Sequence, residues 1–262
     1  MSDVRFQFGK NWLDYLPKLD EERVQHAVAR LHASLGDLTG KSFLDVGCGS
    51  GIHSLAAVRL GACRVHSFDF DQQSVDCARA TKRQFAPTAV WEIERGSALD
   101  ETYLRALGHF DFIYSWGVLH HTGNMWRSLE LLTHADTTTI MISLYADQGI
   151  ISRLWRTLKR VYSSHPLSRR PIEAFSLITM WGPKLVFQPH RVVADWKGYG
   201  RNRGMSAWHD VVDWAGGYPY EFAKPDDVAD FFRSRGFGIV SVNLPKKGVI
   251  RVNEFVFRRL AV

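Results

Sequence analysis

The stretch FLDVGCGSGIHS, residues 43–54, decides the fold of this 262-residue chain. It contains the end of a short apolar strand, residues 42–46, in which Asp45 is the acidic member, and it leads into a helical run that reaches Leu60. Three glycines stand at alternate positions between strand and helix: Gly47, Gly49 and Gly51. Glycines at this spacing allow a sharp turn and bring bare backbone against a ligand, because no Cβ stands in the way. The stretch predicts a small-molecule site on the turn, and a glycine turn without a ligand is the alternative.

The identity of the small molecule is narrowed by the next predicted strand, RVHSFD. Its last residue, Asp69, lies about 20 residues beyond the glycines, where a carboxylate can accept hydrogen bonds from ribose hydroxyls. The G-x-G-x-G spacing differs from the G-x-G-x-x-G of dinucleotide sites. Turn and acid together resemble motif I of the class I S-adenosylmethionine (SAM) dependent methyltransferases. The resemblance implies SAM as cofactor, held by Asp45, Gly47, Gly49, Gly51, Asp69 and Phe70.

Strand and helix patterns alternate from residue 41 to residue 144, which indicates parallel βαβ units. A helix that begins at Pro225 and two alternating strands, FGIVSVNL and VNEFVFRR, end the chain. Class I methyltransferases finish their sheet in this way. The resemblance therefore implies an α/β fold: a Rossmann-like seven-stranded sheet with an antiparallel last strand, flanking helices and an inserted, mostly helical cap. The expected divisions are an N-terminal helical segment closing on the cofactor cleft (1–40), the SAM-binding core (41–144), the cap (145–223) and the last core helix with its strand pair (224–262).

The N-terminal segment contains a predicted amphipathic helix, roughly residues 20–35, with apolar residues at helical spacing. In the family such a helix packs beside the cofactor cleft. The resemblance implies that Lys10 and Trp12 close over the ligand, with the lysine facing a carboxylate. A core-anchoring role for Trp12 is the alternative.

Two further strand ends correspond to family motifs, and the first of them departs from the usual residues. After the third strand the family usually has Gly-Asp, whose carboxylate holds the adenine amino group. This chain has Gly96-Ser97, so Ser97 with the Ala98 backbone would substitute. The fourth strand, HFDFIYSWGVLHHT, resembles motif IV, and open α/β sheets bind ligands at carboxyl ends of strands. We therefore expect Trp116 to His121 to line the mouth of the active site.

Residues 145–223 break the alternation, and we interpret them as the cap. Between residues 151 and 203 the chain has eleven Lys or Arg against two acids, a net charge of +9 that suits an anionic partner or a solvated basic face. An apolar stripe at helical period runs from Ile150 to Tyr162. Such a basic amphipathic helix can contact a membrane surface peripherally, cover a substrate or pack on its own protein. Further on, Pro166, Pro171, Pro183 and Pro189 predict short irregular pieces.

Catalysis by SAM requires little side-chain chemistry, because the methyl group is already activated on a sulfonium and must mainly be aligned with a nucleophile. A hydroxyl or protonated amine would also need a base, and histidine suits neutral pH. His120 and His121 on the loop after strand four are the first candidates, and His121 matches the family's more usual histidine. His209 and Asp213, four apart on a helix that Ser206 can cap, are the second. Loop-stabilising histidines and a surface pair are the alternatives.

Several functional classes are disfavoured. Three cysteines without C-x-x-C spacing suggest neither disulfides nor zinc. The chain has no signal-peptide pattern and no transmembrane-length apolar run, so we expect a cytoplasmic protein. An Asn/Asp-Pro-Pro-Tyr motif and an acidic metal cluster are absent, which argues against DNA adenine methylation and metal-assisted O-methylation. The cap's five tryptophans favour an enclosed small-molecule or peptide acceptor over nucleic acid.

A weaker resemblance concerns the subgroup and does not identify the acceptor. The segments FGKNW, YADQG and DWAGGYPYE are similar to features of a bacterial subgroup near the ubiquinone-biosynthesis methyltransferases. For the reaction we expect methyl transfer to an O or N nucleophile, with S-adenosylhomocysteine as product. Two alternatives stay open: a lipid- or quinone-like acceptor at a membrane surface, and a SAM- or RNA-binding protein without catalysis.

Overall fold

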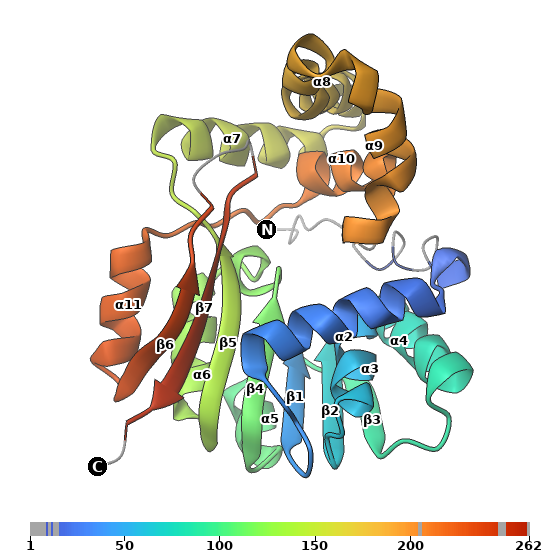
Figure 1. Ribbon diagram of the computed structural model, residues 1–262. Coiled ribbons are helices and arrows are strands. Elements are labelled where there is room, and N and C mark those ends of the chain that lie inside the picture. The colour runs from blue at the N-terminus through green and yellow to red at the C-terminus, as the bar shows by residue number, and fades with distance from the viewer. Residues whose placement is uncertain (1–8, 10–11, 13–15, 204–205, 246–249, 261–262) are drawn as a thin grey trace.

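The computed structural model describes residues 9, 12, 16–203, 206–245 and 250–260. Its centre is a seven-stranded sheet in the order β3-β2-β1-β4-β5-β7-β6 (Figure 1). The strands are β1 (Ser42–Val46), β2 (Arg64–Asp69), β3 (Trp91–Arg95), β4 (Phe110–Trp116), β5 (Thr137–Tyr145), β6 (Phe237–Asn243) and β7 (Val252–Arg259). β7 runs antiparallel to β5 and β6, and β1 to β5 pair in parallel. The predicted fold class is confirmed.

Helices cover both faces of the sheet. The α-helices are α2 (Glu21–Leu35), α3 (Ile52–Arg59), α4 (Gln72–Phe85), α5 (Glu101–Ala106), α6 (Met125–His134), α7 (Ile150–Ser164), α8 (Arg169–Phe187), α9 (Pro189–Arg203), α10 (Ala207–Gly216) and α11 (Pro225–Arg233), and the short 3₁₀ helices are η1 (Leu16–Lys18), η2 (Leu119–His121) and η3 (Pro166–Ser168). Successive strand residues point to opposite faces. Phe43 accordingly packs in the core beneath α2 and α3, while Leu44 packs in the core beneath α5, α6 and α11. Because both faces are covered, the central strands are nearly continuous apolar runs.

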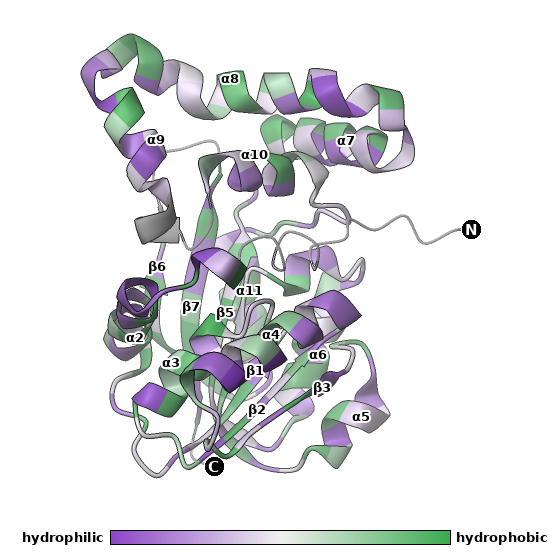
Figure 2. Ribbon diagram, turned by 90° about the vertical axis from the view of Figure 1, so that its right-hand side faces the viewer, coloured by the Kyte–Doolittle hydropathy of each residue, from purple (hydrophilic) through white to green (hydrophobic). Residues whose placement is uncertain are grey.

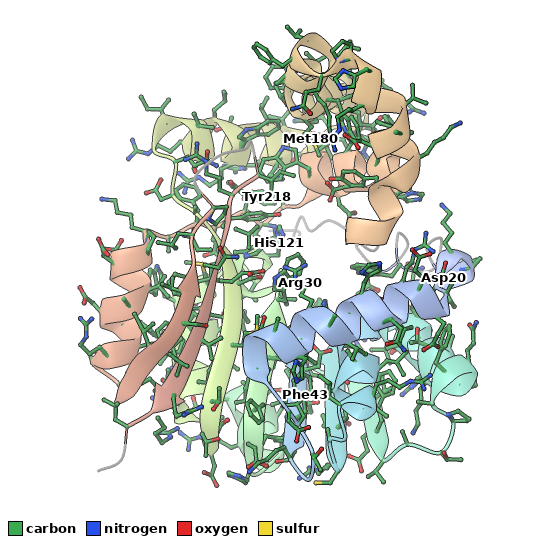
Figure 3. The ribbon with its side chains drawn as sticks, in the orientation of Figure 1. Asp20, Arg30, Phe43, His121, Met180 and Tyr218 are labelled. Atoms are coloured by element: carbon green, nitrogen blue, oxygen red, sulfur yellow. The ribbon has the colours of Figure 1, made fainter. Side chains whose placement is uncertain are left out.

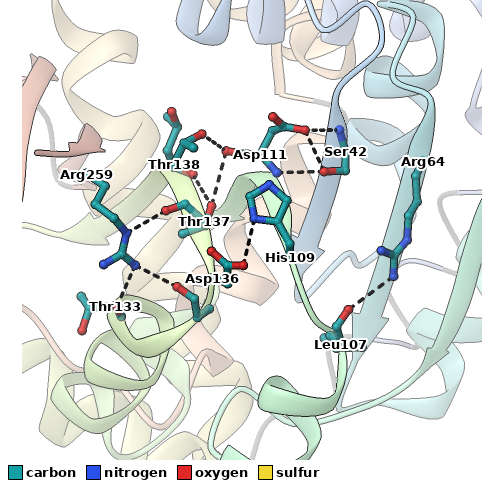
Figure 4. A network of polar contacts seen from close by, with 12 residues as sticks. Ser42, Arg64, Leu107, His109, Asp111, Thr133, Asp136, Thr137, Thr138 and Arg259 are labelled. Atoms are coloured by element: carbon teal, nitrogen blue, oxygen red, sulfur yellow. Dashed lines mark hydrogen bonds and ion pairs between the residues drawn. The ribbon is translucent and has the colours of Figure 1, made fainter. Parts of the chain in front are cut away.

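The amino edge of the sheet is closed by polar contacts (Figure 4). The Asp111 carboxylate accepts hydrogen bonds from the Ser42 amide at 2.9 Å and the Ser42 hydroxyl at 2.8 Å. The Arg259 guanidinium donates to the backbone carbonyls of Thr137 and Ala135, both at 2.9 Å. These bonds tie β1 to β4 and β7 to β5.

Helices α7 to α10 lie above the carboxyl edge, between β5 and α11 in the chain (Figures 1 and 2). Trp155 of α7, Trp214 of α10 and Tyr220 form a buried aromatic cluster that joins these helices to Tyr145 at the end of β5. The predicted Ser206 cap of α10 is confirmed, because its side chain accepts a hydrogen bond from the His209 amide.

The prediction of short irregular pieces around the cap prolines is confirmed at Pro166, which begins the three-residue 3₁₀ helix η3, and is wrong at Pro171, Pro183 and Pro189. α8 is a continuous helix of 19 residues and α9 follows after one residue. Pro171 stands in the first turn of α8 and Pro189 begins α9, positions whose amides lack a partner inside a helix in any case. Only Pro183 stands in a helix interior, where it costs one backbone hydrogen bond.

The apolar stripe of α7 is divided between two environments. Trp155 and Tyr162 are buried, whereas Ile150, Leu154 and Val161 are exposed. The alternative in which such a helix packs its stripe on its own protein thus holds only for the smaller part of the stripe. Within the described ranges, no helix is both long and apolar enough to span a membrane.

Candidate functional site

A cavity of about 340 Å³ lies between the carboxyl edge of the sheet, α2 and the cap. One end is lined by the glycine turn and Asp69, and the other by Tyr145 and Trp214. Figure 3 shows His121 and Tyr218 between the strand ends and the cap helices, with Arg30 rising from α2 toward them. Residues from the predicted core and the predicted cap therefore share one cavity.

The glycine turn has the backbone that its sequence predicts. Gly47, Gly49 and Gly51 all have positive φ angles, of 80°, 53° and 76°, a region that side chains with a Cβ disfavour. Space adds a second constraint. A Cβ at Gly47 would overlap the Val118 side chain, and one at Gly49 would lie 3.0 Å from the Trp12 ring. The turn forms a cradle of bare backbone at the cavity wall.

Asp69 ends β2 and reaches the same turn. One carboxylate oxygen accepts the Gly49 amide at 3.0 Å, and the other accepts the Asp71 amide at 2.9 Å. Burial raises the pKa of Asp69 to about 6, against the lowering effect of these amides. Each carboxylate oxygen has two lone-pair sites, so the group can accept two more hydrogen bonds from a ligand.

The Asp45 carboxylate is buried beneath the glycine turn and forms its hydrogen bonds within the protein. Its carboxylate accepts the Ser54 hydroxyl at 2.5 Å, and that hydroxyl also contacts the Ser67 hydroxyl at 2.7 Å. The Trp91 indole donates to Ser67 at 2.7 Å. Burial, with Asp69 nearby, raises the pKa of Asp45 to about 7. Asp45 still contributes to the cavity lining, but its main contacts join β1 to α3 and β2.

The other residues predicted to bind the cofactor differ in their position relative to the cavity. Trp12 and Phe70 line the cavity, and Trp12 lies against the glycine turn. Lys10 is outside the described residues. Ser97 and Ala98 do not belong to the described cavity lining: the Ser97 hydroxyl accepts the Leu99 amide and Ala98 is buried in the core. An adenine contact at these two residues stays a prediction.

Trp116 at the end of β4 is held by two residues that are distant in the chain. Its indole donates to Glu254 of β7 at 2.7 Å, and Arg30 of α2 donates to the same carboxylate oxygen at 2.6 Å. The Arg30 guanidinium also lies 4.6 Å from the centre of the Trp116 ring. Burial alone would raise the pKa of Glu254, but the bonds from Trp116 and Arg30 hold it below its ordinary value. This contact fixes α2 over the cavity.

His120 and His121 both line the cavity, on the turn η2 that follows β4. Because η2 is a 3₁₀ turn, these two neighbouring side chains do not alternate between opposite faces as they would in a strand. His120 is 1% exposed, and burial lowers its pKa. His121 Nδ1 lies 2.6 Å from the Pro219 carbonyl oxygen, which can only accept, so Nδ1 carries the proton and Nε2 is the acceptor nitrogen. Burial lowers the pKa of His121 to about 3, so the ring is neutral.

The two residues of the second candidate pair, one helical turn apart on α10, differ in their relation to the cavity. Asp213 lines the cavity together with Asp210, whereas His209 is outside the described lining and its Nδ1 lies 2.5 Å from the Ser206 hydroxyl. Lys159 of α7 is fully buried nearby and donates to the Trp214 carbonyl. Burial lowers the pKa of Lys159, and Asp213 and Asp210 partly oppose that shift.

Several lining residues were missed at the sequence level. Arg30, His53, Tyr114, Tyr145 and Tyr218 all contribute to the cavity. His53 could have been found, because it stands in the first helical turn after the glycines, where ligands bind. Burial, with Arg30 next in effect, lowers its pKa to about 3. Arg30 depends on long-range packing, which no local pattern reveals.

Comparison with known sequences points to the same segment of the chain. The family model described as ribosomal protein L11 methyltransferase (PrmA) matches residues 26–97, from α2 to β3. The ribosomal protein L11 methyltransferase of Thermotoga maritima is 31% identical over 126 residues, which are 48% of this chain and 43% of that protein. The chain thus matches less than half of the length of this relative.

Solved structures extend the likeness beyond that segment. Magnesium protoporphyrin IX methyltransferase from Synechocystis PCC 6803, with bound S-adenosylhomocysteine (SAH), has a TM-score of 0.55 and 17% identity, and the match covers 90% of this chain and 81% of that one. A SAM-dependent methyltransferase from Mesorhizobium loti has a TM-score of 0.52 and 15% identity over 88% of this chain and 96% of that one. The chain therefore has the Rossmann-like fold of class I SAM-dependent methyltransferases.

Proposed function

We propose that this chain transfers the methyl group of SAM to an oxygen or nitrogen nucleophile of a small-molecule or peptide acceptor enclosed by the cap. The observation that carries the proposal is the single cavity that joins the glycine turn and Asp69 to His121 and Asp213. A cofactor at the turn and an acceptor beneath the cap would share this space.

The residues present fit the cofactor. The bare backbone at Gly47 and Gly49 lines the cavity at positions where Val118 and Trp12 leave no space for a Cβ, and Asp69 retains acceptor capacity for two ribose hydroxyls. When bound, SAM supplies a methyl group on a sulfonium leaving group. The turn then positions the donor, and Trp12 limits its exposure to water from the N-terminal side.

The acceptor end of the cavity supports deprotonation of an O–H or N–H group. His121 presents Nε2 as an acceptor, because the Pro219 carbonyl fixes the proton on Nδ1. Asp213 and Asp210 provide carboxylates on the cap side, and Tyr145 and Trp214 provide apolar walls. In this arrangement His121, whose pKa is lowered by burial to about 3, takes the proton of a hydroxyl nucleophile as methyl transfer makes that proton strongly acidic, and the carboxylates orient donor groups of the acceptor.

The choice between a peptide acceptor and a lipid- or quinone-like acceptor rests on similarity to known methyltransferases. The name of the curated relatives, which refers to ribosomal protein L11, favours a peptide acceptor. The resemblance to ubiquinone-biosynthesis methyltransferases favours a lipid- or quinone-like one. The exposed apolar residues of the cap support this second candidate.

The proposal is tested by calorimetry with SAH, with NAD⁺ as a comparison ligand, followed by methyl transfer from labelled SAM to peptide, amine and quinol acceptors. We expect micromolar or tighter binding of SAH and no binding of NAD⁺. Absence of SAH binding would overturn the proposal. Binding of SAH without transfer, together with salt-sensitive RNA binding, would favour the non-catalytic alternative.

A further inference from the structure

The outer side of α8 is an exposed apolar face. Phe175, Ile178, Leu185 and Val186 are 43%, 66%, 61% and 72% exposed. Successive residues of an α-helix are rotated by about 100°, so these four side chains fall within an arc of about 100°. Contiguous exposed apolar residues on a helix usually mark an interaction site.

Within this face, the Phe175 ring lies 5.7 Å from that of Trp155 in α7, whereas Ile178, Leu185 and Val186 are mainly exposed. The buried residues of α8, which are Ile172, Ser176 and Trp181, flank the face or lie opposite it by helical rotation, and Trp181 packs against Val211 of α10. Packing within the cap therefore accounts for the buried residues but not for these three exposed ones. Figures 1 and 2 place α8 at the end of the molecule farthest from the sheet, so the core does not obstruct its outer side.

Basic and apolar residues are also interleaved on the exposed side of α7. By the same helical rotation, Ile150, Leu154 and Val161 share one exposed strip, and Arg153 and Arg160 lie directly beside it. Apolar residues flanked by Arg are the composition of helices that rest in the interfacial region of a bilayer.

We propose that the outer face of α8, with the exposed strip of α7, docks on a membrane surface that contains anionic lipid. The occupant is identified by charge: residues 151–203 have a net charge of +9 by sequence, and +8 without the buried Lys159. A second copy of the chain on this face would bring two such segments together, whereas anionic headgroups neutralise them. A nucleic acid would match the charge but leave the apolar residues of α8 exposed to water.

The test is co-sedimentation of the full chain with vesicles, without cofactor, so that it is independent of the proposed methyl transfer. We expect binding to mixed phosphatidylglycerol–phosphatidylcholine vesicles and much weaker binding to phosphatidylcholine alone. Each Arg near an anionic surface contributes about fivefold, so Arg153→Gln with Arg160→Gln should weaken binding about 25-fold. The pair Ile178→Asp and Leu185→Asp should weaken it about tenfold or more.

Val90→Asp is the matched control, because Val90 is 67% exposed and precedes β3 at the amino edge, away from the cap. It should bind vesicles like the wild type, and circular dichroism should show that all variants are folded. The proposal is overturned if Ile178→Asp with Leu185→Asp binds as tightly as the control. It is also overturned if light scattering shows a dimer that this double substitution dissociates, or if the wild type does not bind anionic vesicles.

Discussion

Asp69→Asn tests the cofactor site with a change of few atoms. In the wild type both carboxylate oxygens accept a backbone amide and each can accept one ribose hydroxyl. In the variant one oxygen becomes an NH₂ group, which cannot accept and which faces an amide donor. One hydrogen bond between the charged group and the ligand is lost, at about 1.5–3 kcal/mol. Calorimetry should therefore show SAH binding weakened about 10- to 150-fold.

The pH dependence of binding gives a second, independent measurement. Burial raises the pKa of Asp69 to about 6 in the ligand-free protein, and hydroxyl donors bind the ionised form. The affinity of the wild type for SAH should therefore fall as the pH drops below about 6, and this component should be missing in Asp69→Asn.

Asp100→Asn is the control, because Asp100 likewise accepts a backbone amide, that of Tyr103, but lies outside the described cavity lining. It should bind SAH like the wild type. If Asp69→Asn also does, with an unchanged pH profile, the assignment of Asp69 to the ribose is refuted.

Three further outcomes are expected. His121→Ala should lower kcat about 100- to 10,000-fold at unchanged SAH affinity, and a wild-type kcat in the variant would contradict the role of His121 as base. Because burial lowers the pKa of His121 to about 3, the activity of the wild type should not fall near pH 6.5 on account of this residue. Gly47→Ala should destabilise the fold by more than Gly40→Ala in urea unfolding, because both have positive φ but only the Cβ at Gly47 meets another side chain; equal effects would show that the overlap is relieved. Because burial lowers the pKa of Lys159, the folded chain binds fewer protons there than the unfolded chain, so the free energy of unfolding should rise with pH up to about 10.5, by about 1.4 kcal/mol per pH unit at most. Lys159→Met should remove that rise, and an equal slope of unfolding free energy against pH in the two proteins would argue against this role of Lys159.

The core of the fold could be predicted because its signals are local. Strand alternation, the glycine spacing and a closing acid are each contained in a few residues, and the first two predicted strands, residues 42–46 and RVHSFD, have the observed bounds of β1 and β2. The orientation of Asp69 toward the glycine turn also follows from local order, because β1 and β2 are parallel neighbours whose carboxyl ends meet.

The cap could not be predicted to the same degree, for two physical reasons. Proline predicts a break only in a helix interior, and the sequence did not show that Pro171 and Pro189 stand in first turns. An apolar stripe at helical period also has the same pattern whether protein or water faces it. Ile150 and Trp155 belong to one stripe in the sequence but differ in burial in the structure.

The candidate base depends on a long-range contact that joins both parts of the molecule. The Pro219 carbonyl sets the tautomer of His121, and the Glu221 amide donates to the His120 carbonyl at 2.9 Å. The Glu221 carboxylate in turn accepts the amide of Met125, which begins α6. Residues 219–221 therefore hold the turn η2 from the side of the cap, about a hundred residues away in sequence. The histidine pair alone could nominate a base, but the segment that returns from the cap determines which nitrogen of His121 can act. In the proposed function, acceptor enclosure and proton transfer would thus depend on one backbone segment rather than being divided between cap and core.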